Sequence, residues 1–219
     1  MFWYLLFAHF LADYPLQSNW IVEHKNRPGV LILHILTHLF VSLIVVIFIA
    51  PRSWPYILLL TAIHLLIDTG KSTLNKVKPQ WVVVPYFVDQ FLHILSIAVI
   101  AGLMEPTSGI SPFELRPLWL IGLLVYLVVT YVWYISERII SSYNQSYFQQ
   151  VVNSEWSRMF ARAFFLTFFL ILLSNFRNEN ILILGMSAFP YRRATFGMRA
   201  LFIDILIAIT GALFIFTLV

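Results

Sequence analysis

The chain has 219 residues, of which 60% are hydrophobic and 11% are charged, and its mean hydropathy is +0.84. Soluble domains are about 45–50% apolar and about 25% charged, so this composition predicts a polytopic membrane protein without a separate hydrophilic domain. The net charge of +4 comes from Lys and Arg spread through short loops, which is typical of membrane topology and not of nucleic-acid binding. Because the sequence has no Cys, it excludes disulfides, iron–sulfur clusters and thiolate zinc sites, and any metal must use imidazole and oxygen ligands.

Eight hydrophobic segments follow one another along the chain, so we expect an all-α fold of about eight transmembrane helices. Pro15 interrupts the first segment and predicts a kink there. The seventh segment is short enough to be re-entrant. The first residues lack a basic region and a small-residue cleavage site, so we expect no removable signal peptide. The segments lie at residues 2–22, 29–50, 55–75, 83–104, 117–136, 158–175, 179–192 and 196–218.

The distribution of basic residues predicts the orientation in the membrane. With the N-terminus outside, eleven of the 14 Lys and Arg fall in inner loops, as the positive-inside rule requires. The outer loops then hold Arg52, Arg116 and Arg177. Without the seventh segment, Arg192 and Arg193 would lie on the outer side, so we count that segment as a crossing.

We divide the chain into a four-helix bundle over residues 1–104 and a second membrane half over residues 105–219. The outer connection 105–116 contains Pro and Gly and predicts irregular structure. Near 137–156, apolar residues recur at near-helical spacing. This pattern predicts either an interfacial amphipathic helix or a helix that packs against the bundle.

The second half carries few ionisable residues within its predicted spans. We expect Glu137 and Arg138 to be solvated at a helix end. Asp204 is the one acid of the last span, and we expect a structural role for it, paired with Arg199 or near the membrane interface. The second half is therefore predicted to be a scaffold or the wall of a substrate cavity.

The first four segments hold five of the six His and three of the four Asp, all in pairs spaced i, i+4. Such a pair projects from one helix face, with about 6 Å along the axis between its members. With the predicted topology, all four pairs lie roughly 8–15 Å below the cytoplasmic surface. An ionised Asp within a bilayer costs roughly 2.5–3.5 kcal/mol, so convergence on a bound cation is favoured over separate structural pairs. The pairs are His9/Asp13, His34/His38, His64/Asp68 and Asp89/His93.

We predict that these eight side chains bind one or two divalent metal ions or orient the ligands, with Zn first and Mn or Fe as alternatives. Three further polar residues are candidate catalytic side chains. Gln17 extends the face of the first pair, and Gln90 is placed to donate to a neighbouring helix. Lys71 follows Asp68 by three residues and either snorkels to the interface or binds an anionic substrate group such as phosphate.

Four short motifs carry a resemblance to a known family. The patterns HxxxDxxxQ, HxxxH, HxxIDxxK and DQxxH resemble those of a bacterial inner-membrane family of unknown function. The resemblance covers residues 9–93 and implies a location in the bacterial inner membrane. A looser similarity to membrane-bound metal-dependent hydrolases implies hydrolysis. The matching residues are His9/Asp13/Gln17, His34/His38, His64/Ile67/Asp68/Lys71 and Asp89/Gln90/His93.

The predicted function is hydrolysis of a lipid or lipid-linked phosphate on the cytoplasmic side, by water that the metal activates. The alternatives are a divalent-metal or proton transporter, a haem-binding electron carrier, and an accessory subunit with a structural metal or haem site. The apolar outer halves of the four helices argue against a continuous transport path, and haem ligation does not need Asp beside each His. The expected partners are the lipid bilayer and a lipid-linked or phosphorylated substrate, with no nucleic acid, and an oligomer or a larger membrane complex is compatible with the sequence.

Overall fold

The computed structural model describes residues 1–104, 117–174 and 179–218, and within 179–196 it describes only the backbone. Every regular element in these ranges is helical, which confirms the predicted all-α fold. The chain divides into two compact units, Met1–Leu120 and Ile121–Val219. The connection that we predicted to be irregular, residues 105–116, lies outside the described residues.

Within the described residues, six helices are long and apolar enough to cross a membrane, which confirms that this is a polytopic membrane protein. A further helix, α1 (Phe2–Asp13), is apolar but only 12 residues long. The count of eight crossings and the outside location of the N-terminus remain predictions. The six candidate spans are Pro28–Ile47, Pro51–Val77, Val83–Leu103, Leu118–Tyr143, Glu155–Leu173 and Gly197–Leu218.

The first predicted segment, residues 2–22, is not one kinked helix. Helix α1 ends at Asp13, and α2 (Asn19–His24) begins after a turn, where the Ser18 side chain accepts a hydrogen bond from the backbone of Ile21. The reason is Pro15, which donates no backbone hydrogen bond and disfavours a helical conformation in the residue before it. The chain therefore turns at this point, and α2 packs against α3 (Pro28–Ile47).

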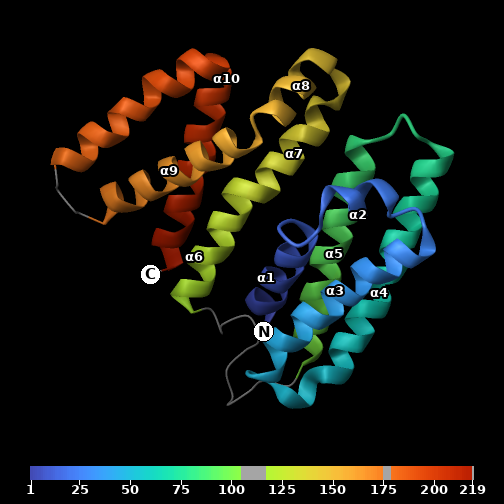
Figure 1. Ribbon diagram of the computed structural model, residues 1–219. Coiled ribbons are helices and arrows are strands. Elements are labelled where there is room, and N and C mark those ends of the chain that lie inside the picture. The colour runs from blue at the N-terminus through green and yellow to red at the C-terminus, as the bar shows by residue number, and fades with distance from the viewer. Residues whose placement is uncertain (105–116, 175–178, 219) are drawn as a thin grey trace. The chain divides into compact units, whose positions relative to one another are not determined.

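Four helices of the first unit close into a ring. Helix α1 contacts α3 and α5 (Val83–Leu103), and α4 (Trp54–Val77) lies between α3 and α5 (Figure 1). The side chains of the paired His and Asp are at most 7% exposed, whereas Phe40, Leu66 and Phe91 on the outer faces are at least 64% exposed. Apolar residues outside and ionisable residues inside suit a bundle that lipid surrounds.

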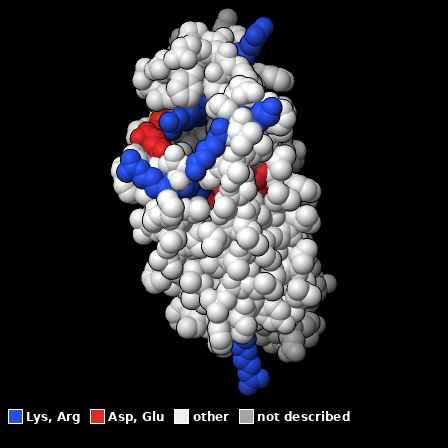
Figure 2. Space-filling model, turned by 90° about the vertical axis from the view of Figure 1, so that its right-hand side faces the viewer, with Lys and Arg blue, Asp and Glu red and all other residues white. Residues whose placement is uncertain are grey.

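Basic residues of the first unit gather at one end of this bundle. Lys25 follows α2, Arg27 precedes α3, and Lys76 lies in the last turn of α4. Figure 2 shows Lys and Arg gathered toward one end of this face, beside acidic atoms, and a wide white surface beyond them. Because inner loops carry an excess of Lys and Arg, we take this end as the predicted cytoplasmic side.

The second unit is built around long helices that pack along one another. Helix α9 contacts both α10 and the π-helical turn η3. Within α10, Gly197 adopts φ +80° and ψ 170°, a region that is essentially restricted to glycine, and the chain changes direction there (Figure 1). Whether residues 179–192 cross the membrane remains a prediction. The elements are α6 (Leu118–Leu127), η3 (Val128–Val132), α7 (Trp133–Ile140), η4 (Ser141–Tyr143), α8 (Gln145–Asn153), α9 (Glu155–Leu173) and α10 (Glu179–Leu218).

The inner connection near 137–156 contains α8 instead of one continuous helix, because Ser141–Tyr143 and Ser154 interrupt it. Val151 of α8 is fully buried and packs with Tyr134 and Met159. Tyr143 and Trp156, at the two ends of this region, are strongly exposed. One side of α8 therefore packs within its own unit, while a location at the membrane interface stays a prediction.

Glu137 is buried, so our expectation that it is solvated was wrong. Its carboxylate accepts hydrogen bonds from the guanidinium groups of Arg158 and Arg162 on α9. The Tyr147 hydroxyl on α8 donates to the same carboxylate at 2.6 Å, and burial raises the pKa of Tyr147, so the phenol keeps its proton. One carboxylate thus joins α7, α8 and α9.

Asp204 on α10 extends the same network. Its Oδ1 accepts a hydrogen bond from Nε of Arg162 at 2.8 Å, so its partner is Arg162 and not Arg199, which is exposed. Both acids of the network and both arginines are buried, and their charges balance. Because Arg158 and Arg162 are spaced i, i+4, one face of α9 meets both carboxylates.

Candidate metal centre

The ring of four helices brings the eight predicted His and Asp into one region. Each helix carries its pair on the face turned toward the ring axis, because its other faces are apolar and exposed. The last turn of α1 supplies one pair, the first half of α3 another, the middle of α4 a third and the first half of α5 the fourth. The contributing residues are His9 and Asp13, His34 and His38, His64 and Asp68, and Asp89 and His93.

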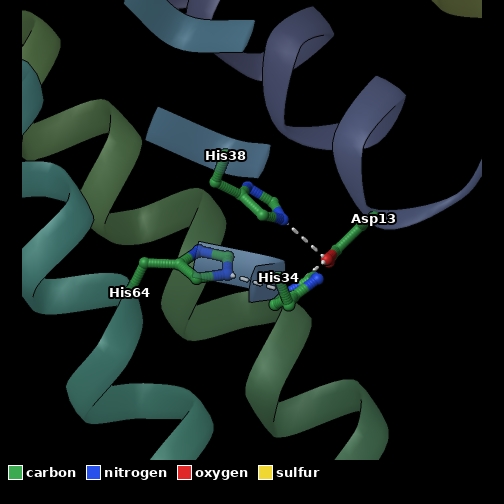
Figure 3. A group of neighbouring side chains, drawn as sticks. All are labelled: Asp13, His34, His38 and His64. Atoms are coloured by element: carbon green, nitrogen blue, oxygen red, sulfur yellow. Dashed lines mark hydrogen bonds and ion pairs between the residues drawn. The ribbon is translucent and has the colours of Figure 1, made fainter. Parts of the chain in front are cut away.

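One group of four could hold a metal ion: Asp13, His34, His38 and His64. Oδ1 of Asp13 lies 3.0 Å from Nε2 of His38 and 3.3 Å from Nε2 of His34, and Nε2 of His64 lies 3.4 Å from Nε2 of His34 (Figure 3). One atom from each residue falls within 4.8 Å of all the others. Zinc–ligand bonds of about 2.0–2.2 Å place ligand atoms at comparable separations, so a small inward shift would complete a tetrahedral site.

A second group that could hold a metal ion consists of His64, Asp68 and His93. Oδ2 of Asp68 lies 3.4 Å from Nε2 of His64, and Oδ1 of the same carboxylate lies 3.6 Å from Nε2 of His93. Asp89, outside this group, places Oδ1 3.4 Å from Nε2 of His93. The metal-binding role of all these residues remains a prediction.

His9 belongs to neither group but lies beside them. Its Nε2 is 3.5 Å from Oδ2 of Asp13, and its ring is 5.1 Å from that of His93. His9 therefore contacts a candidate ligand instead of completing either set. The structure brings all eight predicted residues together and distributes six of them over two overlapping groups.

The two glutamines of the predicted site contact candidate ligands. Gln90 donates to Oδ2 of Asp13 at 3.1 Å, so it reaches the neighbouring helix as expected. The side-chain amide of Gln17 lies 3.3 Å from Nδ1 of His34, although Gln17 lies in the turn after α1 and not on the helical face that we predicted. Contacts of this kind fix the orientation of a metal ligand and set which ring nitrogen is free.

Two lysines sit against the carboxylates of the cluster. Nζ of Lys71 lies 2.6 Å from Oδ2 of Asp89, and its side chain is 26% exposed. Nζ of Lys25 lies 2.9 Å from both Oδ2 of Asp68 and Nε2 of His34. Lys25 is one of the eleven Lys and Arg that we predicted to lie in inner loops, and its contact with the cluster was not predicted. The break at Pro15 could have indicated this contact, because a chain that turns there can bring the next basic residue back over the bundle.

Two tyrosines also belong to this region, and the sequence analysis missed them. The hydroxyls of Tyr14 and Tyr86 lie 2.9 Å apart, and Tyr14 donates to Oε1 of Gln90 at 3.3 Å. The Lys71 ammonium lies 5.7 Å from the centre of the Tyr86 ring. Spacing could have found Tyr86, because it precedes Asp89 by three residues and shares its helix face.

A small cavity of about 20 Å³ adjoins the imidazoles. A polar cavity needs about 10–15 Å³ to hold a water molecule, so this one has room for roughly one. Four imidazoles and three hydroxyls offer hydrogen bonds to it, and aliphatic side chains limit its size. The lining residues are His9, His38, His64, His93, Ser42, Thr61, Ser96, Leu5, Leu60 and Ile97.

The chain was compared with protein-family models, curated proteins and solved structures. The family model described as "Protein of unknown function (DUF3307)" matches residues 1–121, which include the whole bundle and every residue of the cluster. No curated protein and no solved structure matches the chain. The expected resemblance to a family of unknown function is confirmed, and the chain belongs to the DUF3307 family.

Proposed function

We propose that the protein is a membrane-embedded, metal-dependent hydrolase that acts on a lipid or lipid-linked phosphate at the cytoplasmic side of the bacterial inner membrane. The observation that supports this most strongly is the convergence of four polar pairs, from four otherwise apolar helices, on one buried cluster. Three uncompensated carboxylates within a bilayer would cost roughly 8–10 kcal/mol. Lys25 and Lys71 offset part of that cost at Asp68 and Asp89, and a bound divalent cation would offset the remainder.

The donor atoms favour a borderline or hard metal. The group around His34 offers three imidazoles and the carboxylate of Asp13, which suits Zn, with Mn or Fe as alternatives. When bound, such an ion polarises a phosphoryl oxygen and lowers the pKa of a coordinated water to about 7. Gln17 and Gln90 hold His34 and Asp13 in place for this role.

The cavity supports a hydrolytic reaction, because four imidazoles and three hydroxyls line it and it has room for roughly one water molecule. In this proposal the hydroxyls of Ser42, Thr61 and Ser96 line the water site on the deep side. A phosphate ester is too large for this space. The substrate must therefore approach from the opposite, basic end of the bundle.

The lysines are suited to receive a phosphate at that end. The side chains of Lys71 and Lys25 are 26% and 18% exposed, so both are reachable from outside the cluster while they contact its carboxylates. An ammonium binds phosphate as a point charge. Lys71 then positions the phosphate, and Asp89 holds Lys71 at the entrance until substrate arrives.

Transport of an ion through the bundle has less support. Beyond the hydroxyls that line the cavity, the buried residues of α3, α4 and α5 include Val46, Ile57 and Ile100, all apolar. A transport path needs polar groups that continue to the other face. The apolar residues beyond the cavity therefore argue against a continuous transport path.

Metal content and hydrolysis, measured on the same preparations, test the proposal. Purified protein in detergent should contain stoichiometric divalent metal by elemental analysis and should release phosphate or a lipid from a panel of phosphorylated lipids. Asp68→Asn and His38→Ala should lose activity, and His38→Ala should also lose metal. His24→Gln is the matched control, because His24 lies outside the cluster and stacks on Trp20.

Two results would contradict the proposal. Wild-type protein that binds no divalent metal would remove its basis. Protein that binds metal, turns over no phosphorylated lipid and moves the ion across proteoliposome membranes would be a transporter.

A further inference from the structure

The carboxylate of Asp68 faces two different sets of imidazoles with its two oxygens. Oδ2 lies 3.3 Å from Nε2 of His34 and 3.4 Å from Nε2 of His64. Oδ1 lies 3.6 Å from Nε2 of His93. A carboxylate in this position can give one oxygen to each of two ions, as bridging carboxylates do in soluble four-helix bundles.

The side of the cluster around His93 carries buried polar atoms that form ion-pair contacts but no hydrogen bond. Within the described residues, Oδ1 of Asp89, Nε2 of His93 and Nε2 of His9 form no hydrogen bond. The residues that carry them are at most 3% exposed. Leaving buried polar atoms unpaired is costly, and more so for charged groups. A cation between Oδ1 of Asp89 and Nε2 of His93, which lie 3.4 Å apart, would pair both atoms.

We propose that the cluster is a two-metal centre in which Asp68 bridges the ions. The first ion takes Asp13, His34 and His38, and the second takes His64, His93 and Asp89. This inference rests on the proposed metal-dependent function and specifies the number of ions and the role of each ligand.

The two proposed ion sites have matching donor sets. Each ion receives two imidazoles, one terminal carboxylate and one oxygen of Asp68. His64 falls within ligand distance of both groups, but one ring nitrogen can bind only one ion. Assigning His64 to the second ion leaves Asp68 as the residue that serves both. Two ions a few ångströms apart clamp the attacking and leaving oxygens of a phosphate ester, so this centre fits phosphoryl substrates in particular.

Metal stoichiometry and magnetic coupling test this directly, without a variant that must fold. Purified wild-type protein is loaded with Mn²⁺ and desalted, its metal content is measured, and its low-temperature electron paramagnetic resonance spectrum is recorded. We expect two Mn²⁺ per chain and an exchange-coupled spectrum. One Mn²⁺ per chain with the spectrum of an isolated ion overturns the two-metal centre and leaves the proposed function intact. No bound metal overturns both.

Variants assign the ligands. His93→Gln should remove the second ion, leave one Mn²⁺ per chain and abolish the coupling. Asp13→Asn should have the same effect by removing the first ion. His24→Gln is the control and should keep two ions and the coupled spectrum. The midpoint of thermal unfolding, measured on each preparation, identifies variants that fail to fold. A folded His93→Gln protein that keeps two coupled ions would overturn the assignment.

Discussion

Replacing Glu137 with Ala removes the carboxylate that joins three helices of the second unit. Arg162 keeps Asp204 as an anionic partner, and the partners that Arg158 keeps include the Ser154 hydroxyl at 2.7 Å. Both guanidinium groups are 0% exposed, so neither can recover its charge partner from water. Removing one member of a buried ion pair costs about 3–5 kcal/mol. For a chain of this size, that loss lowers the midpoint of thermal unfolding on the order of 10 °C.

The measurement is thermal unfolding of detergent-purified protein, followed by intrinsic tryptophan fluorescence. Glu23→Ala is the control, because it removes the same side chain from an exposed position and should change stability by no more than about 0.5 kcal/mol. Glu137→Gln keeps the shape and one acceptor oxygen, and its midpoint should lie between those of the two Ala variants. If Glu137→Ala and Glu23→Ala unfold at the same temperature, the network adds no net stability and the reasoning fails.

Three further outcomes are expected. Lys25→Met should tighten metal binding at least about tenfold, as measured by calorimetric titration. The Lys25 ammonium lies 2.9 Å from Nε2 of His34 and competes with a metal for the one lone pair of that nitrogen. An unchanged metal affinity would refute the competition. Gly211→Leu should destabilise the protein by about 1–3 kcal/mol relative to Gly122→Leu in thermal unfolding. The reason is that a Cβ at Gly211 meets two side chains at 3.0 Å, whereas Gly122 faces open space. Equal midpoints of thermal unfolding for the two variants would contradict this. Removing metal with a chelator should cost about 2.7 kcal/mol of stability relative to free ion at 100 times its Kd, and a protein with both His38→Ala and His93→Gln should not respond.

Local periodicity made much of the bundle predictable from the sequence. A spacing of i, i+4 fixes which residues share a helix face, so the pairing of His64 with Asp68 followed from geometry that operates within one helix. The high cost of a charge in lipid then implied that these faces must meet. The structure brings the faces together, and helices α4 and α5 begin and end within two residues of the predicted spans.

Contacts between distant segments were beyond the sequence analysis. Lys25 reaches Asp68 only because the chain turns after Asp13, and a hydropathy profile cannot distinguish a break at Pro15 from a kink. Glu137 lies at a predicted helix end, where solvation is the usual outcome, and its burial depends on how α9 packs. In both cases the charged residue and its partner are far apart in the sequence. The spacing of residues within one helix therefore carries no information about the contact.

The two units differ in how their buried carboxylates are compensated by positive charge, and the difference bears on function. In the second unit, the carboxylates of Glu137 and Asp204 pair with the guanidinium groups of Arg158 and Arg162. In the first unit, three carboxylates meet two ammonium groups and five imidazoles. With neutral imidazoles, negative charge is in excess, and a buried excess of charge is costly unless a counter-ion binds. Two divalent ions would reverse the sign and leave an excess of positive charge, which a hydroxide and a phosphate dianion would neutralise. The excess of negative charge in the first unit is therefore a further argument for the proposed metal centre.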